Sequence, residues 1–186
     1  MIEEENILRI LKSTKRAVLS DQPYELKNLS NQTIHSAAIS QDPDNVIVAV
    51  LVYSLGKALE RENYRSMEGW QEFYNDILKY LEIAINSLEK KEIEKCRDAL
   101  GEIRESLNRI DTDLGTYIKD VFRKAEINKA FKLYEHGLSA EQTAKLLGIN
   151  LWDLASYIGQ STISEANASV SMPIKKRAKL AEDFFE

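Results

Sequence analysis

Residues 137–160 carry polar and small residues at spacings that predict two short helices joined by a sharp turn. Ser139 precedes Gln142 by three residues, the capping-box pattern in which the two residues satisfy free backbone amides at a helix start. Gly148 suits the turn, because a residue without a Cβ adopts a left-handed conformation at little steric cost. Asn150 can then cap the following helix with its side-chain oxygen. The segment therefore predicts one short helix, a sharp turn and a second helix.

Residues 129–160, KAFKLYEHGLSAEQTAKLLGINLWDLASYIGQ, resemble the helix-turn-helix modules of prokaryotic DNA-binding regulators, particularly small antitoxin-like proteins. The positions that match the structural part of the motif are Ala144, Leu147, Gly148, Ile149 and Leu154. The resemblance implies transcription regulation and double-stranded DNA as a partner. It also implies that the base-reading face consists of Asn150, Leu151, Trp152, Ala155 and Ser156. Lys145, the one cation between residues 137 and 160, joins these candidate DNA-binding residues.

The charge of this segment departs from the usual pattern of a DNA reader. Lys145 stands against two carboxylates, Glu141 and Asp153. Contacts to phosphate supply most non-specific affinity for DNA, and each of them needs a cation. We therefore expect the segment alone to bind DNA weakly. Exposed Leu151 and Trp152 would instead suit a protein partner, because tryptophan is a favoured anchor of protein interfaces.

The C-terminal part, residues 161–186, reads as a polar linker followed by an amphipathic charged tail. The tail contains the densest basic group of the chain, Lys175, Lys176, Arg177 and Lys179. Two interpretations stay open. The tail either docks its apolar residues Leu180, Phe184 and Phe185 on its own bundle, or it binds a partner protein or supplies the phosphate contacts that residues 137–160 lack.

The sequence contains no signature of catalysis, of a metal site or of a cofactor. It has no glycine-rich phosphate loop and no histidine or cysteine cluster at metal-ligand spacing. His35 and His136 each lack a second ligand nearby in the sequence, and Cys96 occupies an apolar position where burial is expected. We expect neither enzyme activity nor a bound cofactor.

The composition is typical of a folded all-α protein of the cytoplasm. Of the 186 residues 44% are hydrophobic and 30% are charged, with seven glycines and three prolines, which favours long helices around a sizeable core. The net charge of -5 gives no general attraction to nucleic acid. The acidic start MIEEEN opposes a signal peptide, and the longest apolar run, residues 46–53, falls short of the roughly 20 residues that span a bilayer. We expect no membrane partner.

Apolar periodicity predicts an N-terminal helical bundle over residues 1–115. Helices are expected over residues 3–20 and 24–40, with an interruption of the second near Ser30 and Asn31. A nearly all-apolar helix that begins at Asp42-Pro43 should form the bundle core. Two apolar seams, which begin at Met67 and Ile93, predict a long antiparallel helical hairpin. Residues 116–160 should hold a connecting helix over 117–136 and the helix-turn-helix module.

Two functional hypotheses follow. The first is a DNA-associated regulatory protein, a transcriptional regulator or antitoxin-like protein, whose bundle mediates homodimerisation or partner binding. The alternative is a non-enzymatic helical interaction or adaptor protein whose helix-turn-helix no longer contacts DNA and which binds protein through the Trp152 face or the tail.

Overall fold

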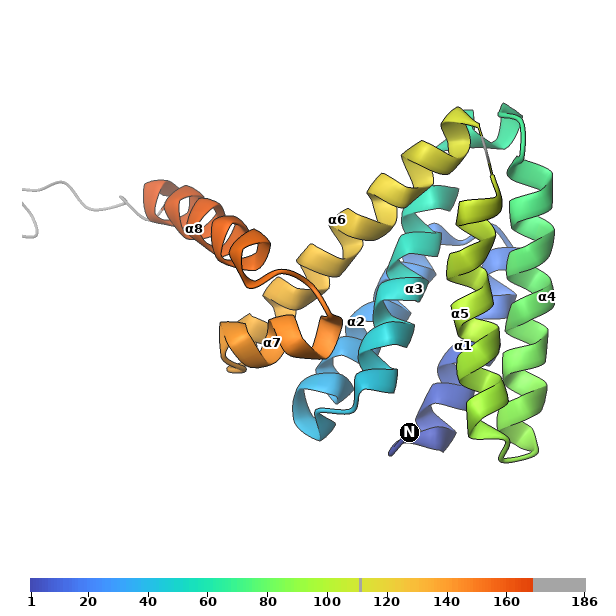
Figure 1. Cartoon of the computed structure of the whole chain (residues 1–186), viewed down its shortest axis with the longest axis horizontal. Coiled ribbons are helices and arrows are strands. Elements are labelled where there is room, and N and C mark those ends of the chain that lie inside the picture. The colour runs from blue at the N-terminus through green and yellow to red at the C-terminus, as the bar shows by residue number, and fades with distance from the viewer. Residues whose placement is uncertain (111, 169–186) are drawn as a thin grey trace, which may run out of the picture.

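The computed structural model describes residues 1–110 and 112–168, which fold into helices and short connections without a strand. The predicted all-α class is confirmed. The elements of the described part, shown in Figure 1, are α1 (Glu4–Leu19), α2 (Pro23–Ser40), α3 (Pro43–Leu59), the 3₁₀ turn η1 (Glu62–Ser66), α4 (Trp70–Glu89), α5 (Ile93–Arg109), α6 (Asp113–Glu135), α7 (Ala140–Leu147) and α8 (Leu151–Ala168). None of the described helices combines the length and apolarity needed to cross a membrane.

Helix α3 lies at the centre of the molecule and is buried on nearly all sides, as its apolar sequence predicts. Val48, Val52 and Leu55 belong to the main core, which α3 shares with α1, α2, α4, α5 and α6. Val46 and Ala49 belong to a second core against α2, α6 and α7. Because α3 contributes side chains to both cores, it lies between the two cores and packs against both.

The predicted start of α3 is confirmed. Pro43 occupies the first turn, and the Asp42 carboxylate accepts a hydrogen bond from the Asp44 amide at 3.1 Å. Asp44 in turn accepts two hydrogen bonds from Arg97 of α5, at 2.9 and 2.7 Å. The Arg97 guanidinium is the main reason that the pKa of Asp44 lies below its usual value. This bidentate pair fixes the first turn of α3 against α5.

Helix α2 is continuous, so the predicted interruption near Ser30 and Asn31 is wrong. Both polar side chains find partners in other helices. The Ser30 hydroxyl donates to the Ala49 carbonyl of α3 at 2.7 Å, and the Asn31 side-chain oxygen accepts from Lys129 of α6 at 3.0 Å. A serine or asparagine weakens a helix when its side chain competes for the local backbone. Here tertiary hydrogen bonds remove that competition.

Helices α4 and α5 run side by side in opposite directions and are joined by residues 90–92 (Figure 1). Cys96 of α5 is buried in the main core, as expected, and this burial raises the pKa of its thiol to about 11. The second apolar seam, which begins at Ile93, does not lie on one helix as the sequence predicted, because it is divided between α5 and α6. Helix α5 ends at Arg109, and Leu114 lies in α6, which begins at Asp113 rather than at residue 117.

Helix α6 connects the bundle to the C-terminal helices. Its first half packs on the main core through Ile118, Val121 and Phe122, and its second half packs on the second core through Leu133. In Figure 1 it crosses α3 and carries α7 and α8 away from α4 and α5. The position of α7 and α8 is therefore set by a helix that is itself anchored in both cores.

Alanine substitutions at Gly115 and Gly101 test how closely the start of α6 packs on Ile110. A Cβ built on Gly115 would collide with the Ile110 carbonyl oxygen and lie 3.2 Å from the carbonyl carbon, whereas a Cβ on Gly101 would meet nothing within 4 Å. We expect Gly115→Ala to lower the free energy of unfolding by about 1–3 kcal/mol through overpacking. Gly101→Ala should raise it by up to about 1 kcal/mol, because alanine has the higher helix propensity. Urea unfolding followed by circular dichroism measures both. Equal effects of the two substitutions would contradict the close approach at Gly115.

Candidate interaction face on the C-terminal helices

The end of α6 and the start of α7 have the geometry that the sequence predicts. Gly137 follows the last turn of α6 with a φ of 96°, and the next amide, of Leu138, donates to the Leu133 carbonyl at 3.3 Å. Ser139 and Gln142 form the reciprocal capping box, with both hydrogen bonds at 3.1 Å. These local bonds define where the chain turns between the two helices.

The turn between α7 and α8 is also as predicted. Gly148 ends α7 in the left-handed conformation with a φ of 66°. Asn150 then caps α8, because its side-chain oxygen accepts from the Trp152 amide at 2.8 Å. A bidentate contact to adenine uses both the oxygen and the nitrogen of an asparagine amide. Asn150 would have to give up the cap to make such a contact.

A small apolar core holds α8 on α6 and α7. It consists of Ala130 of α6, Ala144 of α7 and Leu154 of α8, and the exposure of Leu154 is 0%. Tyr157 of α8 adds an edge-to-face contact with Phe131 of α6, with ring centroids 5.5 Å apart. Leu154 and Tyr157 therefore define the inner side of α8.

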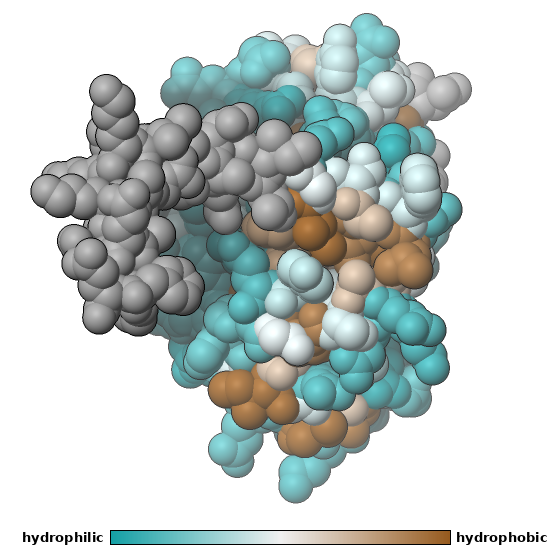
Figure 2. Space-filling model, turned by 90° about the vertical axis from the view of Figure 1, so that its left-hand side faces the viewer, coloured by the Kyte–Doolittle hydropathy of each residue, from teal (hydrophilic) through white to brown (hydrophobic). Residues whose placement is uncertain are grey.

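The predicted base-reading residues lie on the solvent-exposed part of α8. Trp152 is 78% exposed and Leu151 is 46% exposed, while Ala155 and Ser156 are exposed next to them in the sequence. We call Leu151, Trp152, Ala155 and Ser156 the α8 face. Figure 2, which shows this end of the molecule, presents hydrophobic groups scattered among hydrophilic ones. A tryptophan this exposed contributes little to the core, so the α8 face is available to a partner.

Lys145 does not share the surroundings of the α8 face. It borders a cleft of about 440 Å³ whose other walls come from α3, α5 and α6, including Arg97, Arg104 and Glu126. Burial raises the pKa of Glu126, and Arg104 pairs with its carboxylate at 2.6 Å. The tail candidates Lys175, Lys176, Arg177 and Lys179 lie outside the described residues.

Two groupings that the sequence analysis missed become visible in the structure. The rings of His35 in α2 and His136 at the end of α6 lie 5.3 Å apart, edge to face. Among the residues that the structure describes, however, no group of three or more histidine, cysteine, aspartate or glutamate residues could hold a metal ion.

The second grouping is a basic cleft beside α3 and α6, with Lys57, Arg61 and Lys124 in its walls. Tyr53 and Lys57 are four residues apart in α3 and so share one side of it, and Arg61 follows four residues later, just after α3 ends. That spacing was visible in the sequence. The contribution of α6 was not, because Lys124 comes close only through the crossing of α3 and α6.

Comparison of the chain with protein-family models, with curated proteins and with solved structures finds no match.

Substitutions at Trp152 and Leu154 distinguish the exposed α8 face from the buried side chains that hold α8 on α6 and α7. We expect Leu154→Ala to cost about 2–5 kcal/mol of local stability, because it opens a cavity in the small core. Trp152→Ala should change stability by no more than about 0.5 kcal/mol, as is usual for an exposed side chain. Hydrogen exchange of the α8 amides, read by mass spectrometry, reports both. Faster exchange in Trp152→Ala, comparable to that in Leu154→Ala, would show that Trp152 is structural.

Proposed function

We propose that this protein is a non-enzymatic regulatory interaction protein that binds a protein partner through the α8 face. In this proposal α7 and α8 form a helix-turn-helix module, and the bundle with its α4–α5 hairpin is the scaffold. The observation that carries it is the 78% exposure of Trp152 beside half-exposed Leu151, on a helix whose own support comes from other side chains. Exposed tryptophan is the residue type most enriched at energetic centres of protein interfaces.

The charge of the described module supports a protein partner over DNA. Glu141, Lys145 and Asp153 are its exposed charges between residues 140 and 160, so carboxylates outnumber cations. The helix start that would enter a DNA groove contains Asp153, whose charge would face phosphates of the same sign. The Asn150 amide is already used as a helix cap.

Partner capture tests the proposal. Full-length protein is used to recover partners from the native host, with Tyr24→Ala as the control, because Tyr24 is an equally exposed aromatic residue (72%) on α2. We expect the double variant Leu151→Ala, Trp152→Ala to lose at least about tenfold in recovery of a specific partner, since truncated hot-spot residues cost about 2 kcal/mol or more. Tyr24→Ala should retain it. Equal recovery by wild type and the double variant would refute the role of the α8 face.

DNA association is the second candidate function, because two capped helices with an exposed second helix are features of modules that read the major groove. The cations would have to come from Lys175, Lys176, Arg177 and Lys179.

A gel-shift titration with mixed genomic fragments at low salt separates the two functions. The first proposal expects no shift. A salt-sensitive shift that disappears when the four tail cations are replaced by alanine would establish DNA association instead. Asn150→Ala tests base reading, with Ser139→Ala as its control, because both remove a helix cap but only Asn150 lies at the candidate base-reading position. Loss of the shift in Asn150→Ala alone would assign Asn150 to base contact.

A further inference from the structure

The basic cleft is a separate feature from the α8 face. It has a volume of about 540 Å³ and lies between the C-terminal half of α3, the middle of α6 and the inner side of α8. Its polar and aromatic walls come from three elements: Tyr53, Lys57 and Arg61 from α3 and the residues after it, Lys124 and Asn128 from α6, and Tyr157 from α8. Small-molecule sites typically have volumes of roughly 300–1,000 Å³ and a few convergent polar groups.

The cleft walls contain three cations and no carboxylate. Lys57 pairs with Glu60 and Lys124 pairs with Asp120, each at 2.6 Å, but both are pairs within three or four residues on the protein surface. Such pairs are weak and are screened by salt. An anion in the cleft can therefore compete for both ammonium groups. Arg61, whose guanidinium carbon lies 5.3 Å from the centroid of the Tyr64 ring and which donates a hydrogen bond to the Tyr64 hydroxyl, adds a third cation.

A fourth cation lies behind the cleft wall. Lys129 of α6 is only 1% exposed, and its ammonium group contacts the Asn31 side-chain oxygen at 3.0 Å and the Tyr53 ring at 4.2 Å. Both partners are neutral. Burial lowers the pKa of Lys129 to about 8, with smaller contributions from Lys132 and Lys27. A buried cation normally has a charged partner, so the positive potential at Tyr53 is not balanced by the neutral contacts of Lys129.

We propose that the basic cleft binds a nucleoside phosphate. Lys57, Arg61 and Lys124 would contact the phosphate oxygens through charge-assisted hydrogen bonds, which are stronger than neutral ones. Tyr157 offers aromatic surface to a planar base, and the Asn128 amide offers a donor and an acceptor to a base edge.

Two observations favour a single nucleotide over a nucleic acid in this cleft. The net charge of -5 repels a long polyanion, whereas the local excess of cations attracts a small one. The cations also gather around one cleft instead of extending along a face, as a phosphate backbone would require. Because Tyr157 belongs to α8, the ligand would touch the bundle and the helix of the α8 face at the same time.

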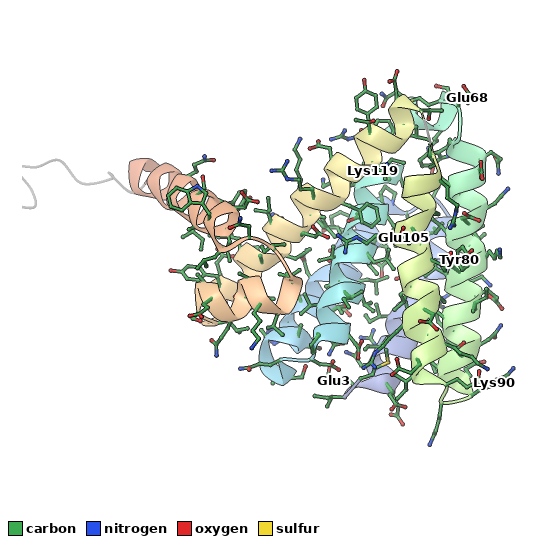
Figure 3. All side chains as sticks on the ribbon, viewed as in Figure 1. Glu3, Glu68, Tyr80, Lys90, Glu105 and Lys119 are labelled. Carbon is green, nitrogen blue, oxygen red and sulfur yellow. The ribbon has the colours of Figure 1, made fainter. Side chains whose placement is uncertain are left out.

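Calorimetric titration of the full-length protein tests the site with four probes: ATP, inorganic pyrophosphate, adenosine and a short DNA duplex. We expect saturable ATP binding with a Kd below about 1 mM. The double variant Lys57→Ala, Lys124→Ala should weaken ATP and pyrophosphate binding at least about tenfold, because each lost cation removes a charge-assisted hydrogen bond. Lys90→Ala is the matched control, since Lys90 lies at the far end of α4 from α6 (Figure 3), and it should leave both affinities unchanged.

Tyr157→Ala separates recognition of the base from recognition of the phosphates. It should weaken ATP binding several-fold and leave pyrophosphate binding unchanged, because stacking on the ring is lost and the cations stay in place. Circular dichroism spectra and melting curves of each variant establish that it folds, and Arg61→Ala provides an independent removal of a cleft cation.

Three results would overturn the nucleotide site: no saturable ATP binding by the folded wild type, ATP affinity that the double cation variant does not change, or binding of the DNA duplex but not of ATP through the same cations. The proposed protein-binding function has its own test. Trp152→Ala should leave ATP affinity intact, so either proposal can fail without the other.

Discussion

Helix α3 is apolar over most of its surface and buried on nearly all sides, and the rest of the structure depends on this constraint. A fully buried leucine or valine side chain contributes roughly 1.5–3 kcal/mol relative to its exposed state, so a helix this apolar must be covered over most of its surface. The main core covers it with side chains from α1, α2, α4, α5 and α6, and the second core covers it with side chains from α2, α6 and α7. The Arg97–Asp44 pair then fixes where the buried helix begins against α5.

The C-terminal helices take their place from this arrangement. Leu138, between α6 and α7, is part of the second core, and Leu146 and Leu147 pack against it. Helix α8 follows through the small core around Leu154. A chain of three apolar clusters therefore connects the centre of the bundle to the α8 face, with no polar linker in between. Trp152 takes no part in that chain, which is the physical reason for proposing it as a recognition residue.

The balance between exposed apolar area and charge separates the two candidate functions. Protein interfaces gain affinity from burying a few large side chains, whereas DNA binding gains it mainly from cations near phosphates. The described module exposes large apolar side chains but lacks the cations that DNA binding needs. Three cations, Lys57, Arg61 and Lys124, line the basic cleft between α3 and α6, and the volume of this cleft suits a small ligand. The α8 face and the cleft meet on α8, because Tyr157 lies on the inner side of the same helix.

The sequence by itself determined the features that depend on neighbours in the chain: the start of α3 at Asp42-Pro43, the capping box of Ser139, the turn at Gly148 and the cap at Asn150. Each rests on hydrogen bonds or backbone angles within about four residues, which residue type and spacing specify directly. The apolar pattern likewise predicted the burial of α3 and Cys96. Only the tertiary structure decided the continuity of α2, the approach of His35 to His136, and the cleft that Lys57 and Lys124 share. Those features join residues that are dozens of positions apart, and their meeting depends on how α2, α3 and α6 pack, which no local pattern encodes.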